Sequence, residues 1–424
     1  MMTFAPAKRS GLVQRLDDFE NLFRQKEPRI HAFLPEADRF QRLRKDASAL
    51  HRKYPKKDKR PPLFGLLLGV KDIFHVDGFA TGAGSRLPAR ELRGKEATSV
   101  TALKRAGMLV AGKTVTTEFA YFYPGHTRNP HATDHTPGGS SSGSAAAVAA
   151  GLVDLALGTQ TIGSVIRPAS YCGVVGFKPS YGRFSANGVI PLAPSFDHVG
   201  LFAQDVAVIS RAAAVLGSNW KPTRGHERKP HLAVPNGEYL ARANAEMRHN
   251  FEAALDSLEV AGYAIKRIEQ FKDFEEIVQR HQLILAAEAA RTHAPWFETY
   301  RHLYQAKTIG LIERGNAISD KELETALDAV SRFRLDISTV MDIHGIDAWV
   351  SPAATGPAPK GLASTGDPVM NLPWTQAGLP VMGLPSASNE EGLPLGLQFS
   401  AGFNRDEDLL DWAPGIQAAL KGRR

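Results

Sequence analysis

The sequence of 424 residues is poor in cysteine and has no strong excess of charge of either sign. Its only cysteine, Cys172, excludes an intrachain disulfide and a zinc site built from several cysteines, which fits a reducing cytosol. The 51 Lys and Arg residues against 44 Asp and Glu residues give a formal net charge of +7, which permits acidic partners without requiring nucleic acid. The composition, 43% hydrophobic and 22% charged, is that of a globular protein rather than a disordered one.

Long apolar runs are also missing. The two longest, Leu63–Val70 and Ala145–Gly158, are too short or too interrupted by glycine to span a bilayer, and Asp154 breaks the second. Residues Met1–Ser10 contain two basic residues but lack the apolar stretch that a secretory signal needs. We therefore expect a cytoplasmic protein with no membrane-spanning segment.

Signatures of metals, cofactors and nucleic acid are absent or incomplete. The fourteen histidines form no H-E-x-x-H motif, and we predict neither a metal site nor a cofactor. Residues Gly107–Thr114 satisfy G-x-x-x-x-G-K-[ST], but the four central residues are apolar and a predicted helix precedes them, which reverses the order of a phosphate-binding loop. The basic run His51–Arg60 has no aromatic or glycine pattern beside it, so we interpret it as a solvated linker rather than a nucleic-acid surface.

Two amphipathic helices are predicted ahead of the main fold, from Gly11 to about Gln25 and from Pro35 to about Tyr54. We interpret residues 1–60 as an N-terminal helical clasp and residues 61–424 as one large domain. Within that domain, residues 236–345 are almost continuously helical. We expect them to form a helical cover on the sheet.

Short apolar runs alternate with helical stretches from Leu66 onward. Strands are expected at Leu66–Phe74, Met108–Ala111, Tyr263–Ile268, Ala348–Ser351, Pro380–Leu384 and Leu395–Phe399. A closing helix is expected after Arg405. This alternation favours the α/β class, with a large central mixed, mostly parallel sheet that helices flank on both faces.

A segment rich in glycine and serine, Thr136–Ser144, precedes the strong helix former Ala145–Ala150. Backbone N–H groups and hydroxyls gather at such a helix start, which suits an anion or a developing oxyanion. The same segment satisfies G-x-S-x-G, the nucleophile elbow of α/β-hydrolases, with Ser141 as the nucleophile. That motif needs a strand before it, whereas Arg128–Pro137 is polar and contains two prolines, so a serine hydrolase using Ser141 is kept only as an alternative.

Three motifs follow one another along the chain: Gly69–Asp72 (GVKD), Thr136–Ser141 (TPGGSS) and Gly158–Ser164 (GTQTIGS). Together with Gly173–Pro179 and stretches near the C-terminus, they resemble the amidase signature family, serine hydrolases that use a Ser-cisSer-Lys triad. The resemblance extends from about residue 60 to residue 410. It implies the fold of that family and the hydrolysis of a small-molecule amide.

The resemblance also implies roles for individual residues. Ser164 corresponds to the nucleophile, Ser140 to a bridging serine in a cis peptide, and Lys71 to the general base. The two serines are 164 − 140 = 24 positions apart, which is the separation expected in the family. Backbone N–H groups that hold the oxyanion of the substrate are implied around three residues, Thr161, Ile162 and Gly163.

The implied chemistry needs a neutral lysine. A serine hydroxyl attacks an amide only when a neighbour removes its proton and the amide oxygen is stabilised. An exposed lysine has a pKa of about 10.4, so burial must lower the pKa of Lys71, and the apolar run before it favours burial at a strand end. The implied products are a carboxylic acid and ammonia or an amine, formed through an acyl-enzyme on Ser164.

The chain departs from the family pattern T-D-T-G-G-S-[IV]-R around the nucleophile. Gln160 replaces the acid, Ile162 replaces one glycine, and the arginine occurs one place later, as Arg167. Loss of the acid and the arginine together suggests that an ion pair was replaced as a unit. A β-branched Ile162 is expected to restrict the backbone and to narrow the substrate pocket.

Substrate and assembly are left open by the sequence. Tyr121–Tyr123 and Trp374 are candidates for an aromatic wall of the site or for ordinary core packing. A second class within the family, the A-subunit-like glutaminase of a tRNA-dependent amidotransferase, stays an alternative to a free-standing amidase. A homodimer is an open alternative to a monomer.

Overall fold

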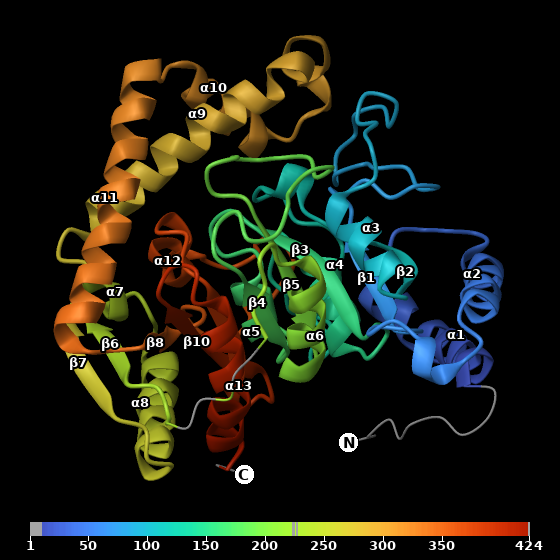
Figure 1. The fold of residues 1–424 in the computed structure, drawn as a ribbon. Helices are drawn as coiled ribbons and strands as arrows, with labels where there is room; N and C mark the ends of the chain where they lie inside the picture. The colour runs from blue at the N-terminus through green and yellow to red at the C-terminus, as the bar shows by residue number, and fades with distance from the viewer. Residues whose placement is uncertain (1–10, 223–224, 226–227, 423–424) are drawn as a thin grey trace.

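The computed structural model describes residues 11–222, 225 and 228–422 (Figure 1). Residues 1–10, where the clasp is predicted to begin and a secretory signal is predicted to be absent, lie outside the described residues. In the described part of the chain, no helix is both long and apolar enough to cross a membrane.

A sheet of ten strands forms the centre of the molecule. In spatial order the strands are β2 (Leu109–Thr114), β1 (Leu67–Lys71), β3 (Leu155–Gln160), β5 (His198–Ala203), β4 (Val175–Lys178), β9 (Val381–Ser388), β10 (Pro394–Ala401), β8 (Ala348–Pro352), β6 (Leu232–Asn236) and β7 (Ile265–Glu269). Every residue of β1, β2, β3, β4, β5, β8 and β10 is buried, because helices cover both faces of the sheet. The six strands expected from the sequence are all present.

The sheet is mixed, but the prediction that it is mostly parallel is wrong. Four of the nine neighbouring pairs are parallel and five are antiparallel. The parallel pairs lie at the two ends of the sheet, and all five pairs from β3 across to β8 are antiparallel. The loop of residues 179–197 joins β4 to β5 without a helix, and residues 389–393 join β9 to β10 as a hairpin, so the chain reverses direction between these neighbours.

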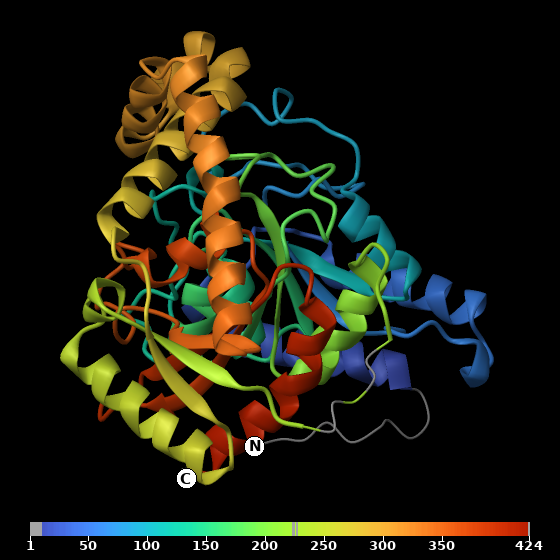
Figure 2. The ribbon, with the colours of Figure 1, turned by 60° about the vertical axis from the view of Figure 1, so that its left-hand side comes forward.

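Helices flank both faces of the sheet, as predicted, and each face has its own apolar core (Figure 1, Figure 2). The first core is covered by α3 (Thr98–Arg105), α6 (Val206–Leu216), α8 (Ala245–Val260) and α13 (Asp406–Lys421). The second is covered by α1 (Gly11–Ile30), α2 (Arg39–Lys53), α4 (Ser142–Ala149), α5 (Ile166–Tyr171), α7 (Glu238–Ala241) and α12 (Leu372–Gln376). Short 3-10 helices are η1 (Lys57–Lys59), η2 (Glu118–Ala120), η3 (Arg301–Leu303) and η4 (Val369–Asn371).

The alanine-rich helix α4 lies against the parallel strands β1, β2 and β3. All of its residues from Ser142 to Val148 are buried, because small side chains let a helix approach a sheet closely. This packing holds the glycine and serine segment, which precedes the helix, at the end of β1 and β3. The predicted helix is confirmed.

Helices α1 and α2 pack on each other and on β2, at the right of Figure 1. The rings of Phe19, Phe23 and Phe40 form the contact between them. The Arg39 guanidinium is buried and donates hydrogen bonds to the carbonyls of Ala111 in β2 (2.9 Å) and Leu34 (2.7 Å). The two predicted helices are therefore confirmed, while the division of the chain at residue 60 stays a prediction.

The predicted helical region contains α8, strand β7 and three further helices, α9 (Phe274–Tyr300), α10 (Ala306–Asn316) and α11 (Asp320–His344). Figure 1 and Figure 2 show that α9, α10 and α11 stand together beyond one end of the sheet. Glu118, after β2, accepts hydrogen bonds from Gln305 N and from Thr308 Oγ1 at the start of α10. These helices thus cover the loops at the end of the sheet, whereas α8 packs on its face.

Candidate active site

The predicted site residues meet at the carboxyl ends of two parallel neighbours, β1 and β3. Lys71 is the last residue of β1, and Gln160 is the last residue of β3. Ser140 lies in the segment just before α4, and Ser164 lies in the loop between β3 and α5. Parallel strands end at the same edge of a sheet, which explains how residues so far apart in the sequence come together.

Lys71 is fully buried and its Nζ has two hydroxyl neighbours. Nζ lies 2.8 Å from Ser140 Oγ and 2.8 Å from Thr159 Oγ1. No described carboxylate forms an ion pair with it, because the adjacent Asp72 pairs with Lys113 at 2.7 Å. Burial holds the pKa of Lys71 well below its ordinary value, and the charge of Asp197 opposes this only in part. The neutral amine is therefore favoured at a position where it can accept a proton.

Ser140 follows a cis peptide bond, Gly139–Ser140, as the resemblance implies. The carbonyl oxygen of Gly139 accepts a hydrogen bond from Arg167 Nη2 at 2.7 Å. A Cβ at position 139 would lie 2.7 Å from Thr365 Cγ2, so only glycine fits here without displacing its neighbour. The Ser140 hydroxyl is thus fixed between Lys71 and the cavity beside it.

Ser164 and Ser140 line the same cavity, which encloses about 280 Å³. Its other lining residues are Ala120, Tyr121, Phe122, Thr161, Ile162, Arg167, Leu192, Thr365 and Pro368. A Cβ on Gly163 would lie 2.2 Å from Asn371 Oδ1, so the residue before Ser164 must be glycine. Within the described part of the chain, the N–H groups of Ile162, Gly163 and Ser164 have no hydrogen-bond acceptor.

The Gln160 side chain holds the loop that carries Ser164. Its Oε1 accepts hydrogen bonds from Val165 N (2.8 Å) and Ile166 N (2.9 Å), and its Nε2 donates to Thr375 Oγ1 (2.9 Å). Thr375 Oγ1 in turn lies 2.6 Å from the carbonyl oxygen of Ile162. An uncharged amide therefore does here what the family pattern gives to an acid.

Asp197 supports the same loop from the other side. Its Oδ1 accepts a hydrogen bond from Thr161 Oγ1 at 2.6 Å, and its Oδ2 accepts from the N–H groups of Leu192 (2.8 Å) and Ala193 (3.1 Å). Burial raises the pKa of Asp197 to about 6, while these hydrogen bonds lower it. The carboxylate fixes Thr161 and lies close enough to Lys71 to influence its charge.

Similarity to known proteins decides the family. Residues 25–410 match the family model described as Amidase. The chain belongs to the amidase family. Amidase 1 of Arabidopsis thaliana is 32% identical, over 70% of this chain and 78% of that protein. The glutamyl-tRNA(Gln) amidotransferase of Methanothermobacter thermautotrophicus has an A-type chain that is 31% identical, over 93% of each chain.

Solved structures of amidases have the same fold. A crystal structure of an amidase has a TM-score of 0.85 at 30% identity, over 96% of this chain and 95% of the other. The native peptide amidase from Stenotrophomonas maltophilia has a TM-score of 0.80 at 26% identity, over 97% of this chain and 94% of the other. The protein is therefore an amide-hydrolysing enzyme with the amidase signature fold.

Ser141 does not belong to the cavity of this amidase. Its side chain is fully buried, and its Oγ bonds to the backbone of Thr159, 3.2 Å from the carbonyl oxygen and 3.3 Å from the nitrogen. No strand directly precedes it, since β2 ends at Thr114. The α/β-hydrolase alternative is thus wrong, because the elbow requires a strand before an accessible serine.

The structure adds residues to this amidase site that the sequence analysis did not single out. Thr159 contacts Lys71 directly, and Asp197 holds Thr161. A hydroxyl two positions after Leu157 in β3 was the available signal for Thr159, since alternate side chains of a strand share a face. Tyr121 and Phe122 line the cavity, whereas Trp374 is buried away from it and donates to Tyr239 Oη at 2.9 Å.

Proposed function

We propose that the chain hydrolyses a carboxylic amide through an acyl-enzyme on Ser164, with Ser140 and Lys71 as a proton relay. The observation that carries the proposal is the 2.8 Å contact of the buried Lys71 Nζ with Ser140 Oγ, at the wall of a cavity that Ser164 also lines. A buried lysine without a carboxylate partner is a poor structural ion-pair residue. It is a suitable general base, because its neutral form is favoured.

The proposed reaction moves one proton along the relay in each direction. Neutral Lys71 takes the proton of Ser140 as Ser140 takes that of Ser164, and Ser164 Oγ bonds to the amide carbon. When the C–N bond breaks, Ser140 gives a proton to the leaving nitrogen and regains one from Lys71. Water then attacks the acyl-enzyme with the same relay, which releases the carboxylic acid and restores Ser164.

The negative charge on the amide oxygen needs hydrogen-bond donors close to Ser164. We assign this role to the loop of Thr161, Ile162 and Gly163, whose rigidity is supported by the hydrogen bonds of Gln160 and Asp197. The unoccupied N–H groups of Ile162 and Gly163 support the assignment, since donors that are already oriented stabilise a developing charge without rearrangement.

Labelling with a serine-directed fluorophosphonate, followed by peptide mapping, tests the nucleophile. We expect modification of Ser164, loss of labelling in Lys71→Met, and loss of both labelling and amide turnover in Ser164→Ala without a change in the circular dichroism spectrum. Ser141→Ala is the matched control and is expected to keep the label. A label on Ser141, or amide hydrolysis by Ser164→Ala, would contradict the proposal.

The glutaminase of a tRNA-dependent amidotransferase is a second candidate function. Curated relatives of similar identity are named as the A-type chain of such an amidotransferase and match most of this chain. Purified protein that hydrolyses simple amides alone favours the free-standing amidase, whereas glutamine hydrolysis that appears only with a partner protein favours the amidotransferase. Cytoplasmic location and a homodimeric state stay predictions, which fractionation and light scattering test.

A further inference from the structure

Arg167 is a buried guanidinium that the proposed mechanism does not use. Its side chain is 1% exposed, lines the cavity of Ser140 and Ser164, and comes from the first turn of α5. Nη2 donates to the carbonyl of Gly139 at 2.7 Å and to Thr365 Oγ1 at 3.3 Å. Nε and Nη1 are buried without a hydrogen-bond acceptor among the described residues. Half of the fork therefore has no protein partner.

The charge of Arg167 is not balanced by a nearby carboxylate. No described acidic side chain forms an ion pair with it, and no acidic residue lines the cavity. Asp367, an exposed residue, attracts it from a distance, while the Asp367 Oδ1 already accepts a hydrogen bond from Val369 N at 2.9 Å. An uncompensated buried charge is strongly unfavourable, so its retention calls for an anionic partner.

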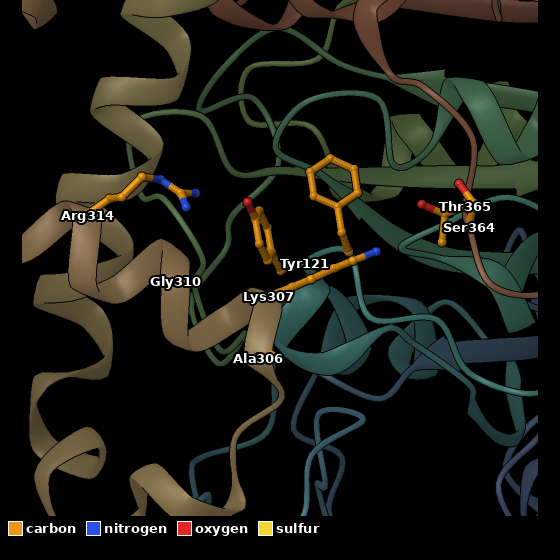
Figure 3. Close-up of a pocket in the computed structure, with 8 residues that line it drawn as sticks. Tyr121, Ala306, Lys307, Gly310, Arg314, Ser364 and Thr365 are labelled. Atoms are coloured by element: carbon orange, nitrogen blue, oxygen red, sulfur yellow. The ribbon is translucent and has the colours of Figure 1, made fainter.

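The outer part of the cavity has the same sign of charge. A wider pocket of about 600 Å³ continues outward past Tyr121, Phe122 and Thr365, which line both spaces. Figure 3 shows Lys307 of α10 extending toward Ser364 and Thr365, and the Arg314 guanidinium directed toward Tyr121. Neither cation has an ion pair with a described acidic residue, and no acidic side chain lines this pocket.

We propose that the amide substrate carries a carboxylate, which Arg167 binds beside the scissile carbonyl while Lys307 and Arg314 attract it from solvent. A carboxylate matches the free edge of the guanidinium, because its two oxygens accept from two N–H groups in one plane. The cavity of about 280 Å³ limits this substrate to a small acid amide. The inference rests on the proposed function, since it names the substrate class of the same site.

A purely structural role for Arg167 makes a different prediction. If Arg167 served only to hold the Gly139 carbonyl, its replacement would slow every amide to the same degree. If it binds a carboxylate, replacement acts on charged substrates and spares neutral ones. The ratio of the two kcat/KM values therefore separates a binding role from a positioning role.

The test compares monoamides of oxalic, malonic, succinic and glutaric acids with the corresponding neutral diamides. We expect at least one monoamide to be hydrolysed with a kcat/KM about 100-fold above that of its diamide. Arg167→Gln should lower kcat/KM for that monoamide by about 100-fold or more and for the diamide by less than about 10-fold. Arg167→Lys, which keeps the charge but loses the fork, should recover part of the preference.

The entrance cations have their own readout. Lys307→Gln with Arg314→Gln should lower kcat/KM for the monoamide by several-fold at low ionic strength, and added salt should remove the difference from the parent protein. Lys45→Gln, an exposed residue in α2, removes a charge far from the cavity and serves as the control. An equal loss in the control variant would show a general effect of net charge and would overturn the role of the entrance.

The outcomes distinguish the inference from the proposed function. Diamides hydrolysed as well as monoamides, or equal losses for both in Arg167→Gln, would overturn the inference and leave the amidase mechanism intact. No hydrolysis together with no labelling of Ser164 would overturn the mechanism. In that case calorimetric titration of Ser164→Ala with the monoamides decides the inference, because binding must disappear when Arg167→Gln is added and absence of any such binding refutes it.

Discussion

Thr159→Val should shift the pH dependence of the enzyme in a direction that identifies Lys71 as the base. The substitution keeps the shape of the side chain and removes the hydroxyl 2.8 Å from Lys71 Nζ. A hydrogen bond from a charged donor contributes about 1.5–3 kcal/mol, and it stabilises the ammonium more than the neutral amine. Its removal therefore lowers the pKa of Lys71 further, in the same direction as burial.

The acid limb of kcat/KM reports this change. Activity requires neutral Lys71, so kcat/KM rises with pH through the pKa of that amine in the free enzyme. Since 1.36 kcal/mol corresponds to one unit, we expect the limb of Thr159→Val to move to lower pH by roughly one unit. The plateau should fall by about tenfold, because Nζ keeps only the contact with Ser140 and is less well oriented.

Two variants complete the experiment. Thr159→Ser restores the hydroxyl and should restore the limb. Thr114→Val removes a buried hydroxyl from the neighbouring strand β2, where Thr114 Oγ1 lies 2.8 Å from Ser144 Oγ, and should leave the limb in place. An unchanged limb in Thr159→Val, or one that moves to higher pH, would refute Lys71 as the group that titrates.

Three further predictions concern stability and specificity. Lys71→Met should raise the melting temperature most at low pH and not at all above about pH 10.4, because the unfolded chain binds the lysine proton more readily than the folded chain does; calorimetry across pH checks this. Arg39→Met should lower the free energy of unfolding by about 2–4 kcal/mol in urea titrations, because two buried carbonyls lose their donor. Ile162→Gly should raise the ratio of kcat/KM for a bulky over a small amide by about tenfold in steady-state assays, since Ile162 lines the cavity; an unchanged ratio would show that this side chain does not limit substrate size.

The elements of the fold followed from local pattern, but the direction of the strands did not. The runs at Leu66–Phe74 and Leu395–Phe399 were recognisable as strands because alternation and length are properties of the segment itself. Whether β4 and β5 run parallel depends on the path of residues 179–197, and nothing in the local apolar pattern specifies that path. The prediction of a mostly parallel sheet failed for this reason.

The candidate site divides in the same way. Lys71, Ser140 and Ser164 could be placed by motif, because the resemblance fixes their order and spacing. Thr159 and Asp197 act through contacts made by the fold: Thr159 touches Lys71 across neighbouring strands, and Asp197 reaches Thr161 from the loop before β5. Such partners have no fixed spacing in the sequence and become visible only when the strands are assembled.

The replacement of the acid and the arginine has a consequence for charge in the site. The sequence suggested that the pair was exchanged as a unit, and the structure shows how the loop does without it: the amide of Gln160 accepts two backbone N–H groups and donates to Thr375. Because an uncharged side chain holds the loop, no carboxylate is present there to neutralise Arg167 one turn later. The positive charge is thus available to a ligand, and the same exchange that looks like a loss in the motif accounts for an anion-binding group beside the nucleophile.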